Sequence, residues 1–101
     1  MDADTFNEQK YTELFPQLQQ AYKNAFNRVN EEYDSTLVHG IDQQVLNESE
    51  PYYDDEVGFY IEIPDDPYDR LSGVVVDKER FDHVLHEYIS EIETELERIF
   101  G

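Results

Sequence analysis

The chain has 101 residues, of which twenty-five are Asp or Glu and only seven are Lys or Arg, giving a formal net charge of -18. A surface of this sign disfavours binding to nucleic-acid phosphates, and the lack of cysteine in the sequence excludes disulfides, thiolate metal sites and thiol nucleophiles. Charge of this size destabilises a compact state by self-repulsion, which dense ions screen over about 3 Å at 1 M salt, so the composition predicts a salt-adapted, halophilic protein.

The apolar content is sufficient for one folded domain spanning residues 1–101, since 39% of the residues are hydrophobic and they include six Phe and eight Tyr. Residues 1–4 are acidic and then polar, without the basic and apolar order of a signal peptide. No apolar run approaches the length of a membrane span. We therefore expect a cytoplasmic protein that makes no membrane contact.

The first half of the chain has the spacing of helices. Apolar residues recur every three or four positions from Tyr11 to Val29, which places them on one helical stripe. Pro16 is tolerated only in the first turn of a helix, so we expect a short helix at 5–14 and a long one at 16–33. Because the apolar spacing continues in phase across Pro16, we expect a kink between them. A further helical segment, capped by Asp34 or Ser35, is expected to run to residue 46, with a strand at 36–39 as the alternative.

The middle of the chain predicts a hairpin with strands at 50–53 and 59–63 around the acidic loop 54–58. Its core-facing side chains would be Phe59, Ile61 and Ile63. Asp66 before Pro67 predicts a capped single turn at 68–71, and residues 74–76 predict a short buried strand.

Asp77 is expected to cap the last helix, at 78–100, which would be roughly 35 Å long. Because a domain of this size has a radius of gyration of only about 13 Å, we expect part of the apolar stripe to outrun the domain. A homodimer contact would cover it, whereas the alternative is that the first long helix covers it alone. The residues predicted for self-association are Leu85, Tyr88, Ile92, Leu96 and Ile99.

Taken together, these elements predict an α+β fold in which long N- and C-terminal helices pack on a small antiparallel sheet of two or three strands. The segments YDSTLVH at 33–39 and IDQQVLNESEP at 41–51, with DPY at 66–68 and GVVVD at 73–77, resemble a family of small acidic haloarchaeal proteins of unknown function. The resemblance spans most of the chain. It implies a salt-in cytoplasm and carries no activity, cofactor or catalytic residue.

Two groups of side chains are candidates for binding metal ions. His83, His86 and Glu87 have helical spacings that can chelate zinc, although a closed site needs further ligands and solvated histidines are the simpler interpretation. The second group consists of acids flanking the second strand, whose oxygens suit calcium or magnesium if the fold gathers them. Turn and capping roles explain these acids equally well. The acids are Asp54, Asp55, Glu56, Asp65, Asp66 and Asp69.

Four tyrosines, Tyr52, Tyr53, Tyr60 and Tyr68, form a candidate partner-binding surface if their rings are contiguous and exposed, and otherwise fill the edge of the core. Catalysis is not favoured, because with twenty-five acids some carboxylate–histidine pairs arise by chance and the serines occupy no nucleophile-elbow pattern. No cofactor is expected.

The function that these observations favour is a non-enzymatic, salt-adapted interaction protein that self-associates. One alternative is a divalent-cation or metal-binding protein. Another is an acidic mimic of nucleic-acid charge that binds a basic protein partner, because residues 29–69 contain no Lys or Arg.

Overall fold

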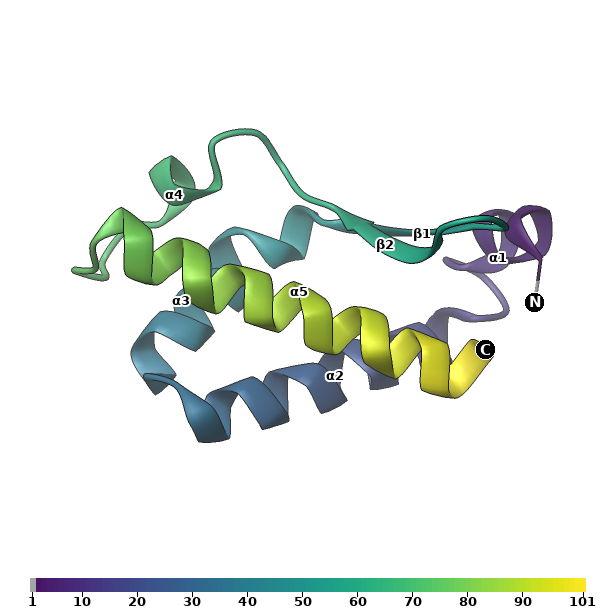
Figure 1. The fold of residues 1–101 in the computed structure, drawn as a ribbon, viewed down its shortest axis with the longest axis horizontal. Coiled ribbons are helices and arrows are strands. Elements are labelled where there is room, and N and C mark those ends of the chain that lie inside the picture. Colours follow the sequence, from purple (N-terminus) through teal and green to yellow (C-terminus); the bar gives the residue numbers. More distant parts are fainter. Residues whose placement is uncertain (1) are drawn as a thin grey trace.

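Two long helices lie side by side and antiparallel along the molecule (Figure 1). They are α2 (Phe15–Glu32) and α5 (Lys78–Phe100) in a computed structural model that describes residues 2–101. Near the middle of the pair, the rings of Phe26 and Tyr88 are 6.4 Å apart and Arg28 Nε is 3.6 Å from Glu91 Oε2. Together with a two-stranded hairpin they form the predicted α+β fold.

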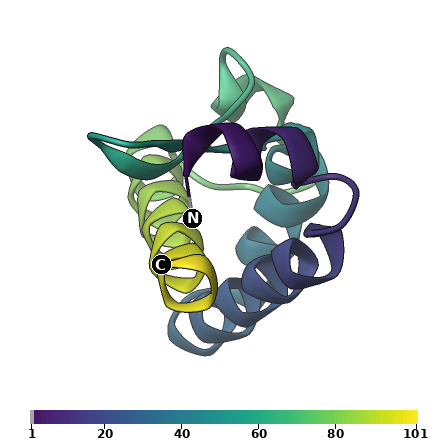
Figure 2. The same ribbon diagram turned by 90° about the vertical axis from the view of Figure 1, so that its right-hand side faces the viewer.

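The N-terminal segment reverses direction before the first long helix. Helix α1 (Ala3–Gln9) is capped by Asp2, whose side chain accepts a hydrogen bond from Thr5 N at 2.8 Å. Residues 10–14 are mostly turns, and Pro16 lies in the first turn of α2, where its missing N–H costs nothing. The predicted kink is therefore wrong: the two helices share an apolar phase but lie in different parts of the fold (Figure 2).

Helix α3 (Ser35–Gln44) forms as predicted, and the alternative strand at 36–39 does not. Asp34 caps it by accepting from Leu37 N at 3.3 Å. Gly40 is buried in this helix, and a Cβ there would lie 2.9 Å from Leu71 Cδ1 and 3.1 Å from Val74 Cγ2. The glycine thus lets residues 71–74 pack closely across α3. A short 3-10 helix, η1 (Leu46–Glu48), then leads into the sheet.

Strands β1 (Glu50–Asp54) and β2 (Gly58–Glu62) pair antiparallel, with Tyr52 opposite Tyr60 and Tyr53 opposite Phe59. The acidic loop is closed by Asp54 Oδ1, which accepts from Glu56 N at 2.8 Å and from Val57 N at 3.0 Å. Gly58 has φ 96°, a left-handed conformation that favours glycine and completes the turn. As predicted, Phe59 is buried in the core, while Tyr60 and Glu62 are exposed.

The segment between β2 and α5 departs from the predictions in two places. Asp66 precedes α4 (Pro67–Arg70) but has φ 51° and makes no capping hydrogen bond through its side chain. The strand predicted at 74–76 is also wrong, because the segment has no strand beside it and the sheet of the described residues holds β1 and β2 alone. Val75 is fully exposed, whereas Val74 and Val76 pack against the core.

Helix α5 begins as predicted, with Asp77 accepting from Arg80 N at 2.8 Å. The molecule measures 40 × 26 × 23 Å, so a helix of about 35 Å spans its long axis instead of outrunning it. Leu85, Tyr88, Ile92 and Leu96 are buried within the single chain, and only Ile99 of the predicted self-association stripe is partly exposed. Helix α2, with β2 and α3, therefore covers most of this stripe within one chain, and self-association stays a prediction.

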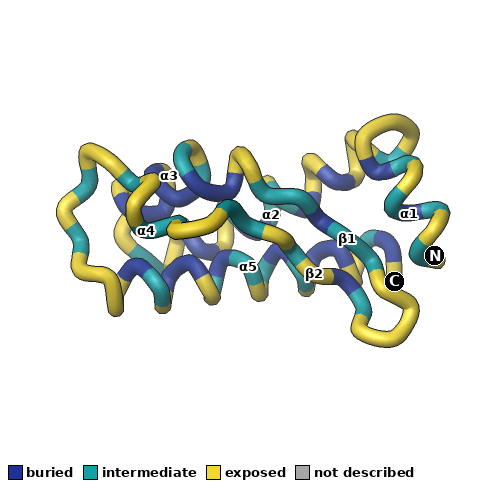
Figure 3. Tube along the Cα trace, turned by 90° about the horizontal axis from the view of Figure 1, so that it is seen from above, coloured by how far each residue is buried: buried dark blue, intermediate teal, exposed yellow. Residues whose placement is uncertain are grey.

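The core lies between the two long helices and under the hairpin, so buried positions alternate with exposed ones along α2, α3 and α5 (Figure 3). The rings of Phe6, Phe59 and Phe100 meet at the end where α1, β2 and α5 converge, with Phe6 at 5.1 Å from Phe59 and 5.4 Å from Phe100. Between residues 2 and 101, no helix is both long and apolar enough to cross a membrane.

Candidate functional site

A pocket of about 350 Å³ opens where the turn after α1 meets α2, η1 and β1. Its apolar lining comes from Tyr11, Phe15, Leu18, Tyr22, Leu46 and Pro51. Tyr11 is 51% exposed and Phe15 is 39% exposed, and their rings meet edge to face at 6.3 Å. Exposed aromatic rings beside a concave surface are typical of ligand-binding and protein-binding sites.

Polar groups are concentrated on one side of this pocket. Ser49 Oγ donates to Leu46 O at 2.6 Å, so the Tyr22 hydroxyl, 3.0 Å from Ser49 Oγ, is the donor in that second hydrogen bond. Burial raises the pKa of Tyr22 to about 12. Gln19 and Asn47 add amide groups at the pocket wall. The pocket can therefore hold an apolar group and also hydrogen-bond to a neighbouring polar atom.

Lys10 lies beside the pocket, almost fully buried at 4% exposure. Its Nζ donates to Pro51 O at 2.9 Å, lies 2.9 Å from Glu50 Oε2, and sits 3.6 Å from the centre of the Tyr52 ring. These three contacts compensate for removing the ammonium from water. The hydrogen bond from Lys10 also holds the pKa of Glu50 below its ordinary value.

A second pocket, of about 250 Å³, lies on the other side of Tyr22 and is lined also by Lys23, Phe26 and Asp42. At this pocket the buried Tyr88 hydroxyl donates to Asp42 Oδ1 at 3.0 Å. Burial, and then the Asp42 charge, raise the pKa of Tyr88. The two pockets share Tyr22 and both lie along α2, and we refer to them together as the α2 groove.

The charged residues that line the α2 groove are Lys23 and Asp42, and Glu50 lies close to Tyr11 at its edge. Burial, and then the charge of Glu50, raise the pKa of Tyr11. Lys10, beside the groove, is engaged by Glu50 and Pro51. The base-free segment 29–69 supplies the α3, η1 and β1 side of the groove. A cationic group placed next to Tyr11 would therefore meet the charge of Glu50.

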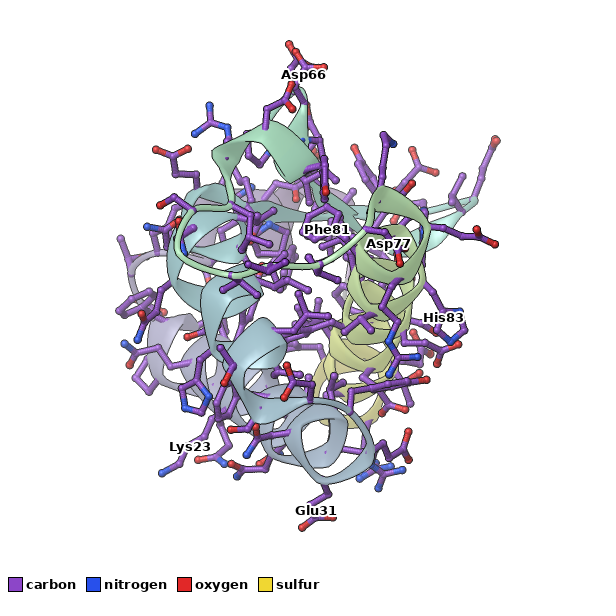
Figure 4. The ribbon with its side chains drawn as sticks, turned by 90° about the vertical axis from the view of Figure 1, so that its left-hand side faces the viewer. Lys23, Glu31, Asp66, Asp77, Phe81 and His83 are labelled. Carbon is purple, nitrogen blue, oxygen red and sulfur yellow. The ribbon has the colours of Figure 1, made fainter. Side chains whose placement is uncertain are left out.

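The predicted metal-binding histidines do not converge. His83 lies on the outer surface of α5 (Figure 4), with Nε2 3.4 Å from the Tyr33 hydroxyl, and His86 Nδ1 donates to Asp82 O at 2.7 Å. Glu87 lies on the same helix and brings no third ligand. No three His, Asp or Glu side chains anywhere in residues 2–101 are grouped so as to hold a metal ion.

The two predicted acid clusters lie at opposite ends of the molecule, with the hairpin loop near α1 and α4 at the far end (Figure 1). Asp54 closes its own turn, which lowers its pKa through hydrogen bonds from the Glu56 and Val57 N–H groups, and Asp55 Oδ1 accepts from Ala3 N at 3.1 Å. The remaining acids, Asp65, Asp66 and Asp69, stay around α4. A single cation site built from both clusters is therefore wrong.

The four predicted partner-binding tyrosines separate into two pairs. Tyr52 and Tyr60 stack across the outer face of the hairpin, with ring centres 5.5 Å apart. Tyr53 packs against Phe59 at 4.6 Å, while Tyr68 packs on Phe81 at 5.3 Å and donates to Val76 O. Only the first pair offers an exposed aromatic surface, and the second serves the edge of the core.

Sequence reasoning missed the α2 groove and buried Lys10. One signal was present, because Lys10 follows Phe6 by four residues and so lies on the buried side of the first helix. The pocket walls, in contrast, come from segments more than twenty residues apart, and no local pattern joins Tyr11 to Ser49 or Pro51.

Comparison with curated proteins and with solved structures finds no match for this chain. A family model does match it, along residues 1–101. The chain therefore belongs to a family of unknown function, DUF5783.

Proposed function

We propose that this chain is a salt-adapted interaction protein whose α2 groove binds a partner segment carrying apolar and cationic side chains. The observation that carries the proposal is the groove itself, with Tyr11 and Phe15 exposed at its mouth and Glu50 close to Tyr11. Aromatic side chains that remain exposed beside a concave surface contribute strongly to binding when a partner covers them.

Salt adaptation is supported by how few of the acids meet a base. Ion pairs engage Lys10, Arg28, Arg70, Lys78 and Arg98, each with a different acid, which leaves most of the twenty-five acids without a cationic partner. On α5, Glu93 and Glu97 are like charges four residues apart, a pairing that costs about 0.2–0.5 kcal/mol in dilute buffer. Molar salt removes most of this penalty, because the Debye length falls to about 3 Å.

The chemistry of the partner follows from the lining of the groove. An aliphatic or aromatic side chain fits against Tyr11, Phe15 and Leu46, while a Lys or Arg beside it faces the rim near Glu50. Because the electrostatic part of this attraction is screened by salt and the apolar part is not, the groove suits a partner that must bind in concentrated salt.

Calorimetry with short synthetic peptides tests the proposal in about 1 M KCl, where the Debye length is about 3 Å. The first probe is a peptide in which Phe and Leu are flanked by Lys, and its matched control carries Ser in place of Phe and Leu. We expect the first alone to bind, and Phe15→Ala to weaken it at least about tenfold, or about 1.4 kcal/mol. The control variant Val57→Ala truncates a residue that is 76% exposed far from the groove.

Two results would contradict the groove assignment. One is the absence of heat or chemical-shift changes with the Phe–Leu peptide at any salt concentration. The other is equal binding by Phe15→Ala, Val57→Ala and the unmodified chain, which would place the ligand elsewhere on the surface.

A further inference from the structure

The two outer edges of the hairpin are treated differently by the fold. On β1, the Asn7 side chain donates to Tyr53 O and accepts from Tyr53 N, both at 3.1 Å, so it takes the place of a neighbouring strand. Lys10 donates to Pro51 O, and Pro51 has no N–H to satisfy. The outer edge of β1 is thereby closed by α1.

The outer edge of β2 has no such partner. The backbone groups of Pro51 and Tyr53 point away from β2, since they bond Lys10 and Asn7. In an antiparallel pair, the backbone N–H and C=O groups of the opposite residues, Ile61 and Phe59, therefore point away from β1. Throughout the described chain, no hydrogen bond reaches the N–H or C=O groups of Phe59 and Ile61. Helix α5 passes beneath the sheet, and no strand or helix lies level with β2 on its open side (Figures 1 and 3).

We propose that the open edge of β2 pairs with the same edge of a second copy of this chain, giving a continuous four-stranded antiparallel sheet across a two-fold axis. This inference does not depend on the α2 groove, which lies where α2 meets α3, η1 and β1 and does not include β2. A strand edge with unpaired backbone groups is a template for adding another strand.

The register of this pairing follows from the residues. With the axis at Tyr60, Phe59 of each copy pairs with Ile61 of the other, and all four free backbone groups of each strand are satisfied. Tyr60 then meets its own copy across the axis, which extends the Tyr52–Tyr60 stack into a row of four rings. Tyr60 is 38% exposed in the single chain, so it has area to bury.

Charge also selects this register. Glu62 of one copy lies opposite Gly58 of the other, so no two acids are directly opposed within the paired strands. Each copy nevertheless carries a formal charge of -18, and the two repel at long range in dilute buffer. The dimer is therefore expected to strengthen with salt, whereas binding of a cationic peptide to the same edge would weaken.

Disulfide trapping tests the register directly, because the natural chain has no cysteine. Tyr60→Cys places its two thiols across the axis at a non-hydrogen-bonded pair, where Cβ atoms are about 4.5–5.5 Å apart. We expect rapid disulfide dimer formation by Tyr60→Cys in about 1 M KCl, where screening is strong. Matched controls are Glu62→Cys, which faces Gly58 of the other copy, and Val75→Cys on a fully exposed loop.

Sedimentation of the cysteine-free chain supplies the second measurement. We expect a concentration-dependent dimer that grows with KCl and is lost in Ile61→Pro, which removes one of the free N–H groups, and in Tyr60→Glu, which opposes two acids on the axis. Val75→Glu should dimerise like the unmodified chain, and circular dichroism checks that each variant is folded. A monomer at every salt and protein concentration, or equal trapping of Tyr60→Cys and Val75→Cys, would overturn the proposal.

Discussion

Replacing Lys10 by Met tests whether this buried ammonium holds the N-terminal segment to the hairpin. The variant keeps the apolar stem of the side chain and removes the charge that contacts Pro51 O, Glu50 and the Tyr52 ring. A hydrogen bond from a charged donor contributes about 1.5–3 kcal/mol and a cation–π contact about 0.5–1 kcal/mol. The ion pair adds little, because the Glu50 side chain is 41% exposed.

The change also relieves the cost of burying an ammonium, which offsets part of these gains. We therefore expect Lys10→Met to lower the free energy of unfolding by about 2 kcal/mol, a large share of the 5–15 kcal/mol typical of a domain. Urea unfolding in high KCl measures this value, and an unchanged dependence of the unfolding free energy on urea concentration shows that two-state behaviour persists. Lys23→Met is the matched control, since Lys23 is exposed and its loss should change stability by less than about 0.5 kcal/mol.

A second measurement separates the role of the charge from that of packing. In Lys10→Met the pKa of Glu50 should rise toward its ordinary value, because the hydrogen bond that lowers it is gone. A carboxyl whose pKa is lowered by folding stabilises the protein at pH values above its ordinary pKa, and this stability is lost as the pH falls through the pKa of the folded state. The variant should therefore lose less stability on acidification than the unmodified chain. Equal stability of Lys10→Met and Lys23→Met, with Glu50 titrating as before, would refute this account of the buried lysine.

Three further predictions concern other buried or charged groups. Burial raises the pKa of Tyr22 to about 12, so the neutral hydroxyl should stabilise the fold by about 2–3 kcal/mol. This stability should be complete below about pH 10 and be lost as the pH rises through about 12. Tyrosinate absorbance followed alongside unfolding would detect the loss. Asp42→Ala should lower the free energy of unfolding in urea by about 1–3 kcal/mol, because the buried Tyr88 hydroxyl loses its hydrogen-bond acceptor. The loss should exceed that of Tyr88→Phe, which removes the donor itself. The reverse order would show that the hydroxyl finds another partner. Glu97→Lys turns a like-charge pair with Glu93 into an attractive pair near the C-terminus of α5. Thermal unfolding should show a gain in stability of about 0.5–1 kcal/mol in dilute buffer that shrinks in molar KCl. A gain that does not depend on salt would contradict the electrostatic explanation.

The parts of the fold that sequence predicted best are those whose signals are local. Asp77 followed by a long apolar stripe defined α5, and the glycine-ended acidic loop defined the hairpin, because caps and turns depend on neighbouring residues. The strand predicted at 74–76 failed for the opposite reason. A β-branched run favours an extended backbone, but a strand also needs a partner edge, and the local sequence cannot show whether one is nearby.

The candidate sites show the same limit more strongly. The acids of the hairpin loop and those around α4 are close in sequence, yet the fold sets them at opposite ends. The α2 groove and the contacts of Lys10 depend on the docking of α1 against β1, across about forty residues of chain. The average shape assumed for a domain of this size also misled, since the 40 Å long axis accommodates the whole of α5.

The amide of Asn7 has a consequence for how large an assembly of this protein can grow. A two-stranded ribbon with both sides available would recruit neighbours without limit and build filaments. By occupying the backbone of Tyr53, Asn7 leaves each molecule one open strand edge, so the proposed pairing would stop at two copies. In the proposed assembly, the short N-terminal helix would thus act as a terminator of polymerisation.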